Sequence, residues 1–369
     1  MKLYYVANVR VPTEKAHGYQ ISKMCESLVR AGADVTLVIP QRRNFIDESL
    51  FKFYGIEENL FKIKRIPTID LTFIQKKIFY RILSFSFACF SFLYFLFKRG
   101  NVSIYCRGES VLWLAMLPKR FCVFWESHIK PGRLDLYQKP VSRLRGVVCV
   151  TSYYQKEIIE IFDISKENVL LFPDAVDIEA FNIQKEQDVA RKLLGIPQDK
   201  WIVMYVGSDL KWKGVDVLKG AANLLPANFL VIFVGNISSE GDGKGYYVGQ
   251  KNQKEIPLWL KASDCLVLTG NSESSVSRNY TSPLKMFEYM ASKRPIVSFR
   301  IPSFGDILGS GNSLVLKNNT PEDLASNLLH LEENPSVASK IVDQAFLDVQ
   351  AYTWDKRAVT VLSFLNKRI

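Results

Sequence analysis

Residues 201–236 read WIVMYVGSDLKWKGVDVLKGAANLLPANFLVIFVGN and decide the fold, because they contain a strand, a helix and a second strand in succession. The apolar runs WIVMYV and FLVIFV are short and uncharged, as expected of strands that are buried on both faces. Between them, Lys213-Gly214 precedes a segment that we expect to be helical from Val215. A strand, helix and strand in this order predict two parallel strands joined by a crossover helix.

The same alternation recurs along the chain. The first half has the runs KLYYVANV, DVTLVIP, VSIYC, FCVFWES and GVVCVTS, and the second half has DCLVLTG and RPIVSF. The sequence therefore predicts an α/β protein with two Rossmann-like, doubly wound domains in tandem that face each other across a cleft. We place the domains at residues 1–180 and 181–350, separated within a polar stretch, and expect 351–369 to form a helix that packs back on the first domain.

The composition of the 369 residues fits a globular protein with a basic surface. Hydrophobic residues make up 48% of the chain, and 48 lysines and arginines stand against 37 acidic residues, which gives a net charge of +11. The excess is spread over short clusters at 62–65, 76–77 and 98–99. Dispersed clusters favour a membrane surface or small phosphates as partners over nucleic acid.

Cysteine and histidine usage argues against a metal centre. No two of the six cysteines form a Cys-x-x-Cys pair, and the chain has only three histidines. Such cysteines are typical of buried thiols in a reducing cytosol, and no zinc site is expected. The N-terminal apolar run is too short for a signal peptide and is expected to be the first strand. The sequence thus predicts a cytoplasmic protein.

Residues 82–97, ILSFSFACFSFLYFLF, carry no charge and are flanked by Arg81, Lys98 and Arg99. The run is shorter than the ~20 residues that a membrane-spanning helix needs. Two interpretations remain open: a helix buried against the sheet, or an interfacial helix whose basic flanks meet anionic lipid. The second would place the protein at the inner face of the plasma membrane as a peripheral protein.

Residues 281–297, TSPLKMFEYMASKRPIV, are the first candidate binding site. Ser282 is a suitable N-cap, and Pro283 suits the first helical position, so the helix start can attract an anion. Lys285 adds a positive charge that favours phosphate, and the Glu288 carboxylate can accept hydrogen bonds from the hydroxyls of a ribose. The alternative is that Lys285 and Glu288 form a solvated pair on an exposed helix face.

Two further positions lie where a predicted strand ends. Lys213 opens a helix after the strand WIVMYV, so its ammonium can reach a diphosphate. His128 directly follows the strand FCVFWES, although a lone histidine can also be a structural residue. Ligands of doubly wound domains bind outside the carboxyl ends of the strands, which is where both residues are expected.

Taken together, the motifs resemble glycosyltransferase family 4, and within it a subset with the pattern SPLK…EYMA. The resemblance covers nearly the whole chain, in family order, through HGYQISKMCESLVRAGADVTLV, IYCRGES, FWESH, CVTSYYQKEI, NVLLFPDAVDIEAF, YVGSDLKWKGVDVL, IPLWLKASDCLVL, SPLKMFEYMASKRPIVSF and YTWDKRA. It implies the GT-B fold and a retaining transfer of a sugar from a nucleoside diphosphate, with the nucleotide sugar as co-substrate and no other cofactor.

The resemblance also implies residue roles. Lys213 matches the lysine that holds the donor diphosphate, Glu288 the glutamate that binds the ribose, and His128 the histidine that contacts the donor sugar. Ser282, Leu284 and Lys285 match the helix start that meets the phosphates, Gly18 matches a glycine of the first loop, and the loop from Gly249 to Ile256 matches the nucleobase cradle.

Two positions depart from the family pattern. The first glutamate of the family's Glu-x7-Glu motif is replaced by Tyr280, and the usual arginine after the VG strand by Ser208. Glu273, in the same loop as Tyr280, could replace the lost glutamate, but an ordinary polar loop residue is the favoured interpretation. These departures concern the contacts to the donor sugar.

The predicted function is a metal-independent, retaining hexosyltransferase that acts on a glycan or lipid-linked acceptor in bacterial surface polysaccharide assembly. A catalytically degenerate GT-B partner subunit and a nucleotide-sugar 2-epimerase are the alternatives. The epimerase needs several acid/base residues, for which only His128 and Glu126 are candidates. A dehydrogenase is disfavoured because the first strand–helix turn lacks Gly-x-Gly-x-x-Gly.

Overall fold

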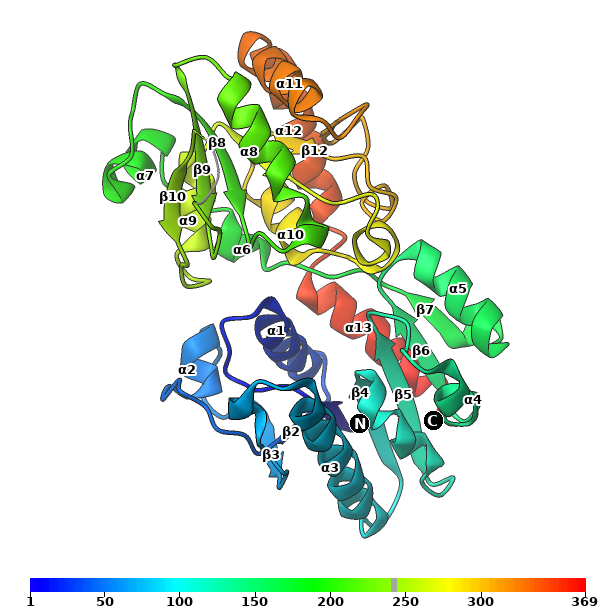
Figure 1. Ribbon diagram of the computed structural model, residues 1–369. Helices are drawn as coiled ribbons and strands as arrows, with labels where there is room; N and C mark the ends of the chain where they lie inside the picture. The colour runs from blue at the N-terminus through cyan, green and yellow to red at the C-terminus, as the bar shows by residue number, and fades with distance from the viewer. Residues whose placement is uncertain (240–243) are drawn as a thin grey trace. The chain divides into compact units, whose positions relative to one another are not determined.

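The computed structural model describes residues 1–239 and 244–369, which form two compact units (Figure 1). The first unit comprises Met1–Pro173 and Trp354–Ile369, and the second comprises Asp174–Thr353. These divisions differ from the expected boundaries at residues 180 and 350. The reason is a backbone hydrogen bond of 2.9 Å from Val176 N–H to Tyr352 O, which pairs the two crossing segments inside the second unit.

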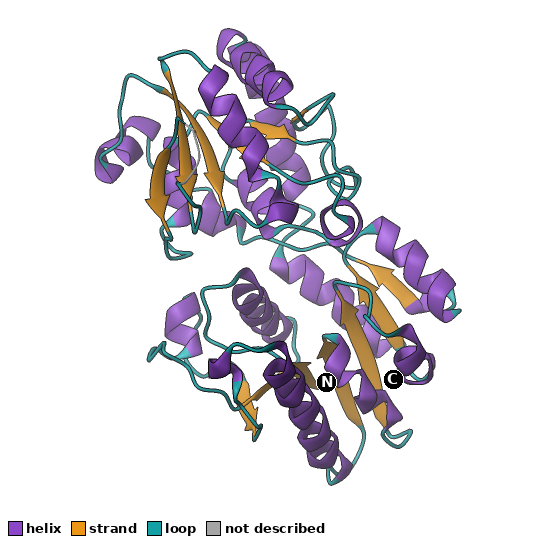
Figure 2. Ribbon diagram, in the orientation of Figure 1, coloured by secondary structure: helices purple, strands orange, loops and turns teal. Residues whose placement is uncertain are grey.

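The first unit contains a seven-stranded parallel sheet in the order β3-β2-β1-β4-β5-β6-β7. Figure 2 draws the strands in orange and the helices in purple. The strand order reverses direction between β1 and β4, as in a doubly wound fold. The strands are β1 (Lys2–Ala7), β2 (Asp34–Pro40), β3 (Lys62–Ile66), β4 (Val102–Arg107), β5 (Phe121–Ser127), β6 (Gly146–Cys149) and β7 (Val169–Leu171).

Helices cover both faces of this sheet. The long helix α1 (Ala16–Arg30) packs against the C-terminal helix α13 (Trp354–Asn366) on one face. The other face carries α3 (Lys77–Leu96), α4 (Leu134–Ser142) and α5 (Ser152–Phe162), together with the 3₁₀ helix η2 (Glu109–Met116). The remaining elements of the unit are α2 (Leu50–Tyr54), η1 (Thr72–Ile74) and η3 (Lys166–Asn168).

The second unit contains a six-stranded parallel sheet in the order β10-β9-β8-β11-β12-β13. Its strands are β8 (Trp201–Val206), β9 (Phe229–Val234), β10 (Tyr246–Gly249), β11 (Cys265–Leu268), β12 (Ile296–Ser298) and β13 (Leu314–Val315). Its helices are α6 (Ile178–Phe181), α7 (Gln187–Leu194), η4 (Lys211–Lys213), α8 (Val215–Leu224), α9 (Ile256–Ala262), η5 (Val276–Tyr280), α10 (Leu284–Ala291), α11 (Pro321–Glu333) and α12 (Pro335–Val349). The helices α8 and α11 pack together, as do α10 and α12.

These two sheets confirm the predicted α/β fold of two Rossmann-like domains. The strands that the sequence analysis did not identify lie at sheet edges, and one of them, β3, contains the basic cluster at 62–65. Exposed lysines on an edge strand hinder pairing with another chain. That cluster is therefore part of the sheet.

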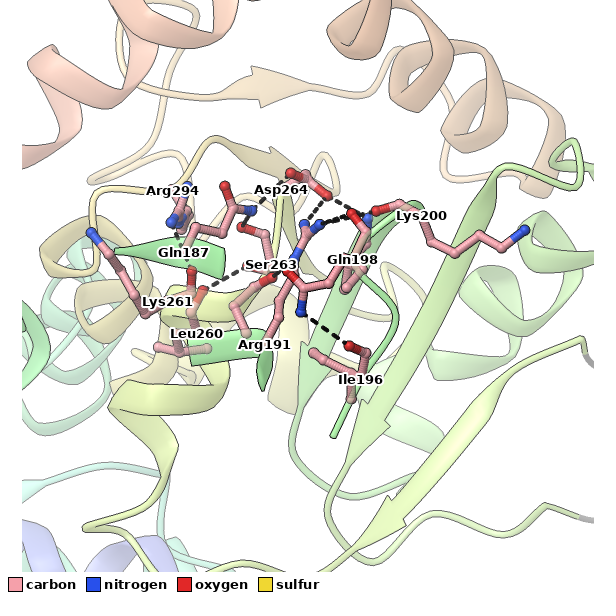
Figure 3. A network of polar contacts seen from close by, with 12 residues as sticks. Gln187, Arg191, Ile196, Gln198, Lys200, Leu260, Lys261, Ser263, Asp264 and Arg294 are labelled. Atoms are coloured by element: carbon pink, nitrogen blue, oxygen red, sulfur yellow. Dashed lines mark hydrogen bonds and ion pairs between the residues drawn. The ribbon is translucent and has the colours of Figure 1, made fainter. Parts of the chain in front are cut away.

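The polar stretch before β8, which the sequence analysis treated as a linker, contains α7 and is fixed to the sheet by a network around Arg191 and Asp264 (Figure 3). The buried Arg191 guanidinium lies 2.5 Å from Asp264 Oδ2 and donates through Nε to Ala262 O at 2.9 Å. Asp264 Oδ2 also accepts the backbone N–H of Ile202 at 2.6 Å. One carboxylate thus joins α7 to the start of β8.

The apolar run 82–97 lies almost wholly within α3, which has one buried face and one exposed face. Phe87 and Phe95 are buried in the core of the first unit, whereas Phe85 is 73% exposed and Leu93 is 47% exposed. In the part of the chain that the structure describes, α3 is the one helix long and apolar enough to cross a membrane, judged by length and composition only. Its inner face is core-forming, and its outer face is apolar without being covered.

Candidate functional site

The start of α10 carries most of the predicted binding residues, but its N-cap differs from the prediction. The helix begins at Leu284, and the preceding Pro283 is extended, with φ −77° and ψ 129°. Ser282 is therefore one position too early to cap the helix, and its Oγ instead accepts the backbone N–H of Asp174 at 3.0 Å. The predicted N-cap role of Ser282 is wrong.

Lys285 lies on the inner side of α10. Its Nζ sits 3.9 Å from the centre of the Tyr205 ring, a cation–π contact, and has no hydrogen-bond partner among the described residues. Burial, and secondarily the positive charge of Lys213, holds the pKa of Lys285 well below its usual value. The alternative of a solvated Lys285–Glu288 pair is therefore wrong.

Glu288 is also buried, with 7% of its surface exposed. Its Oε1 accepts a hydrogen bond of 2.7 Å from Gln253 Nε2, which comes from the segment between β10 and α9. Burial raises the pKa of Glu288 to about 7, although the bond from Gln253 and the charge of Lys285 oppose the rise. The loop predicted to cradle the base thus contributes a side chain to the glutamate predicted to bind the ribose.

Lys213 ends η4, immediately before α8. Its Nζ donates to Ser208 Oγ at 2.7 Å, and burial lowers the pKa of Lys213. Ser208 is the position where the family pattern has an arginine. In this chain, Ser208 occupies that position, and its hydroxyl oxygen accepts the hydrogen bond from Lys213.

Glycines bring the backbone close to these lysines. A Cβ on Gly235 would overlap the carbonyl oxygen of Gly207. The segments that follow β8 and β9 therefore approach so closely that only glycine fits at position 235. A Cβ on Gly207 would lie 3.2 Å from Lys285 Nζ. The Lys285 ammonium thus lies directly against the carboxyl end of β8.

In the first unit, His128 directly follows β5 and contacts Glu126. The distance from His128 Nε2 to Glu126 Oε1 is 3.1 Å, and Arg357 Nη2 of α13 donates to the same oxygen at 2.7 Å. The Tyr5 hydroxyl donates to Glu126 Oε2. Burial alone would raise the pKa of Glu126, but the hydrogen bond with His128 and the charge of Arg357 hold it well below its usual range.

Gly18 is not in a loop but in the first turn of α1, where it is buried. A Cβ there would overlap the Tyr54 hydroxyl. That hydroxyl accepts the backbone N–H of Thr13 at 2.9 Å and donates to Thr13 O at 2.7 Å. The loop placement of Gly18 is wrong, and the structure gives this glycine a packing role.

The predicted residues thus form two sets. In the second unit, the charges of Lys213 and Glu288 both act on Lys285, whereas His128 belongs to the first unit. The sequence analysis did not identify Gln253 or Arg357 as partners of these residues. Over residues 1–239 and 244–369, no three or more histidine, cysteine, aspartate or glutamate side chains gather as they would around a metal ion.

One family model matches the second half of the chain. Residues 186–347 match the family model described as glycosyl transferases group 1. The matched residues lie within the second unit, Asp174–Thr353. Lys213, Lys285 and Glu288 all lie within the matched residues.

Curated relatives carry glycosyltransferase names. The chain is 25% identical over 230 residues to "Putative teichuronic acid biosynthesis glycosyltransferase TuaC" of Bacillus subtilis, with 61% of this chain and 56% of the relative covered. It is 23% identical over 251 residues to a D-inositol 3-phosphate glycosyltransferase of Nocardioides sp., with 60% and 53% covered. The chain thus spans about half the length of the curated relatives it matches.

Solved structures share the fold over the full length of the chain. Sucrose-phosphate synthase from Thermosynechococcus elongatus aligns with a TM-score of 0.78 at 16% identity, covering 100% of this chain and 99% of that one. Anabaena HepE in complex with UDP aligns with a TM-score of 0.74 at 14% identity, covering 98% and 100%. These likenesses confirm the GT-B fold, two α/β domains each with a parallel sheet and flanking helices.

Proposed function

We propose that the protein is a retaining hexosyltransferase that transfers a sugar from a nucleoside-diphosphate sugar to a glycan or lipid-linked acceptor. The observation that carries the proposal is the buried Lys285 ammonium, which has no hydrogen-bond partner among the described residues. A buried cation without a partner is costly unless an anion binds to it. The diphosphate of a nucleotide sugar would supply that anion.

The other groups of the second unit fit the parts of such a donor. Lys213 would hold the diphosphate together with Lys285, and the backbone N–H groups at the start of α10, at Leu284 and Lys285, would donate to its oxygens. The Ser282 hydroxyl can still donate its hydrogen there, since its oxygen is what accepts from Asp174. Glu288 would bind the ribose hydroxyls.

The chemistry follows from where negative charge develops. As the bond between the sugar and the diphosphate breaks, the leaving diphosphate gains charge, which Lys213, Lys285 and the helix start would stabilise. Neither a metal ion nor a further cofactor has a role in this proposal. His128 is assigned to the donor sugar, and the retaining outcome is assigned from the resemblance to glycosyltransferase family 4.

The acceptor and the location of the protein are also proposed. Relatives named for teichuronic acid biosynthesis support an acceptor in bacterial surface polysaccharide assembly. The outer face of α3 exposes Ile78, Phe85 and Leu93, and the basic residues Arg81 and Arg99 are exposed at this helix and just beyond its end. Apolar side chains flanked by cations suit the surface of an anionic bilayer, so we place the protein in the cytoplasm, peripheral on the inner face of the plasma membrane.

Vesicle flotation tests the membrane part of the proposal. We expect wild type to float with vesicles that contain phosphatidylglycerol and not with phosphatidylcholine vesicles, and we expect Phe85→Ser to lose most of that binding. Leu193→Ser is the matched control, because Leu193 is an apolar residue of α7 that is 60% exposed. Equal flotation of wild type and Phe85→Ser would contradict a role for α3.

Donor turnover tests the enzymatic part. The protein is incubated with UDP-, GDP-, CDP-, ADP- and TDP-sugars, and release of the nucleoside diphosphate is measured with and without membrane extract as the acceptor source. We expect turnover of one donor class, lost in Lys213→Ala. Binding of a nucleotide without turnover under any condition would instead favour the non-catalytic partner subunit.

A further inference from the structure

A buried network lies beneath His128 in the first unit, and its carboxylate and guanidinium have no role in the site described so far. Glu126 is 1% exposed and Arg357 is 0% exposed. The two residues are far apart in the sequence, one at the end of β5 and the other in α13. Folding therefore brings the C-terminal helix to the strand end that carries His128.

Both oxygens of Glu126 are engaged. Oε1 accepts from Arg357 Nη2 at 2.7 Å and lies 3.1 Å from His128 Nε2, and Oε2 accepts from the Tyr5 hydroxyl. Arg357 also donates through Nη1 to the backbone carbonyls of Phe172 and Pro173. Main-chain atoms therefore fix the guanidinium, and the guanidinium fixes the carboxylate.

The pairing determines the charge of Glu126. A fully buried carboxylate becomes neutral unless a cation or several donors compensate for its lost hydration. Arg357 supplies the cation, because its guanidinium remains protonated in proteins. Glu126 therefore faces His128 as an anion.

An anion at this position acts on the imidazole in two ways. It favours the proton on Nε2, which makes Nδ1 the acceptor nitrogen of the neutral ring. It also fixes the ring plane, because the hydrogen bond must stay close to linear. His128 itself is not enclosed, with 23% of its side chain exposed.

We propose that Glu126 is a positioning residue that holds His128 in the Nε2-protonated tautomer and in one orientation, and that Arg357 of the C-terminal helix keeps Glu126 ionised for this task. The catalytic consequence rests on the proposed function, in which His128 contacts the donor sugar. The consequence for the tautomer does not depend on it.

The tautomer can be measured directly. Protein labelled with ¹⁵N-histidine has only three imidazoles, and His128→Asn identifies the signals of His128. Above the titration of the ring, we expect long-range ¹H–¹⁵N spectra of wild type to show Nε2 protonated and Nδ1 unprotonated. Glu126→Gln should give averaged shifts of a tautomer mixture, whereas Arg357→Lys should keep the wild-type pattern in part.

Activity gives the second readout, with a matched control. Glu26 is a carboxylate of the same unit that is 2% exposed and paired with Lys23 at 2.5 Å and Arg30 at 2.8 Å. We expect Glu126→Gln to lower kcat on the order of 10- to 100-fold, the size usual for partners that orient a functional histidine, with less than about a twofold change in donor KM. Glu26→Gln should leave both parameters near wild type.

Two results would overturn the inference. One is a His128 spectrum that is the same in wild type and Glu126→Gln, whether or not the protein shows transferase activity. The other is an equal fall in kcat for Glu126→Gln and Glu26→Gln, which would mean that Glu126 acts through stability alone. A wild type that transfers no sugar but shows the single tautomer would count against the proposed function and leave the positioning role standing.

Discussion

The buried charges of the two units differ in how they are compensated. In the first unit, Glu126 is paired with Arg357, hydrogen-bonded to Tyr5 and in contact with His128, so the chain itself satisfies the charge. In the second unit, the Lys285 ammonium is also buried, yet it lies over the face of the Tyr205 ring and has no hydrogen-bond partner among the described residues.

The difference separates two uses of a buried charge. A charge that is paired within the chain can hold a neighbouring group in place, as we infer for Glu126 and His128. A buried charge that the chain leaves without a hydrogen-bond partner has an unfavourable free energy that a bound ligand of opposite charge can relieve. Lys285 is of the second kind. The proposed function therefore depends on Lys285 rather than on the paired network of Glu126, Arg357 and His128.

The largest expected effect comes from breaking a paired charge in the second unit. This variant tests whether a buried charge is structural because it is paired, whichever unit it lies in. Arg191→Met leaves the Asp264 carboxylate without its cation and three backbone carbonyls without their donor. We expect the free energy of unfolding to fall by about 3 kcal/mol. Urea denaturation measures this, and the nucleotide affinity of the folded fraction should stay at the wild-type value.

A loss of nucleotide affinity in folded Arg191→Met would weaken the comparison, because a structural charge would then act on the binding site. No change in stability would show that the network in Figure 3 contributes little in solution.

A smaller effect on the free energy of unfolding, an increase rather than a decrease, is expected from replacing Glu288. Burial raises the pKa of Glu288 from 4.5 to about 7, so its carboxyl group binds a proton more tightly in the folded chain than in the unfolded chain. Its contribution to stability is therefore lost as the pH rises through this interval. Glu288→Gln should raise the free energy of unfolding at pH 8.5, on the order of 1 to 3 kcal/mol, and change it little near pH 4.

Thermal unfolding of wild type and Glu288→Gln across this pH range checks the sign. Parallel curves for the two proteins would show that Glu288 titrates normally, and the compensation by Gln253 would then be stronger than the structure indicates.

The smallest effect is expected at an exposed ion pair. Lys52 lies 3.8 Å from Glu48, and the two side chains are 71% and 49% exposed. Lys52→Met should change the free energy of unfolding by less than about 0.5 kcal/mol, because solvent screens the pair. A change as large as that of Arg191→Met, measured by the same denaturation, would contradict the distinction between buried and exposed charges.

Much of the fold follows from sequence patterns. The central strands of both sheets are uncharged apolar runs, and the crossover helix from Val215 begins where the pattern predicts. The edge strands β3, β7, β10 and β13 were not identified, because edge strands are short or polar and do not carry the buried signature. The helix α7 was not identified because its charged residues are typical of a linker. Only the folded structure shows that Arg191 pairs with Asp264.

The site was predictable only where its residues are local. The order of Lys285 and Glu288 along one helix, and of Lys213 after one strand, is visible in the sequence. The burial of Glu288 and of the Lys285 ammonium is not visible there, and it decides between a surface pair and a binding site. The partners Gln253 and Arg357 lie in segments that the sequence analysis quoted, but these segments are distant in sequence from Glu288 and Glu126, so the contacts were not predictable.

Isothermal titration calorimetry with UDP, GDP, CDP, ADP and TDP on wild type and Lys285→Met tests the central claim most directly. Lys192→Met serves as control, since Lys192 is an exposed lysine of the same unit. We predict that wild type and the control bind one nucleoside diphosphate equally, and that Lys285→Met is at least as stable but binds it at least about 100-fold more weakly, as expected for loss of two hydrogen bonds to a charged group. Wild-type affinity in Lys285→Met would contradict the account, because the buried ammonium would then not be the group that recognises the diphosphate.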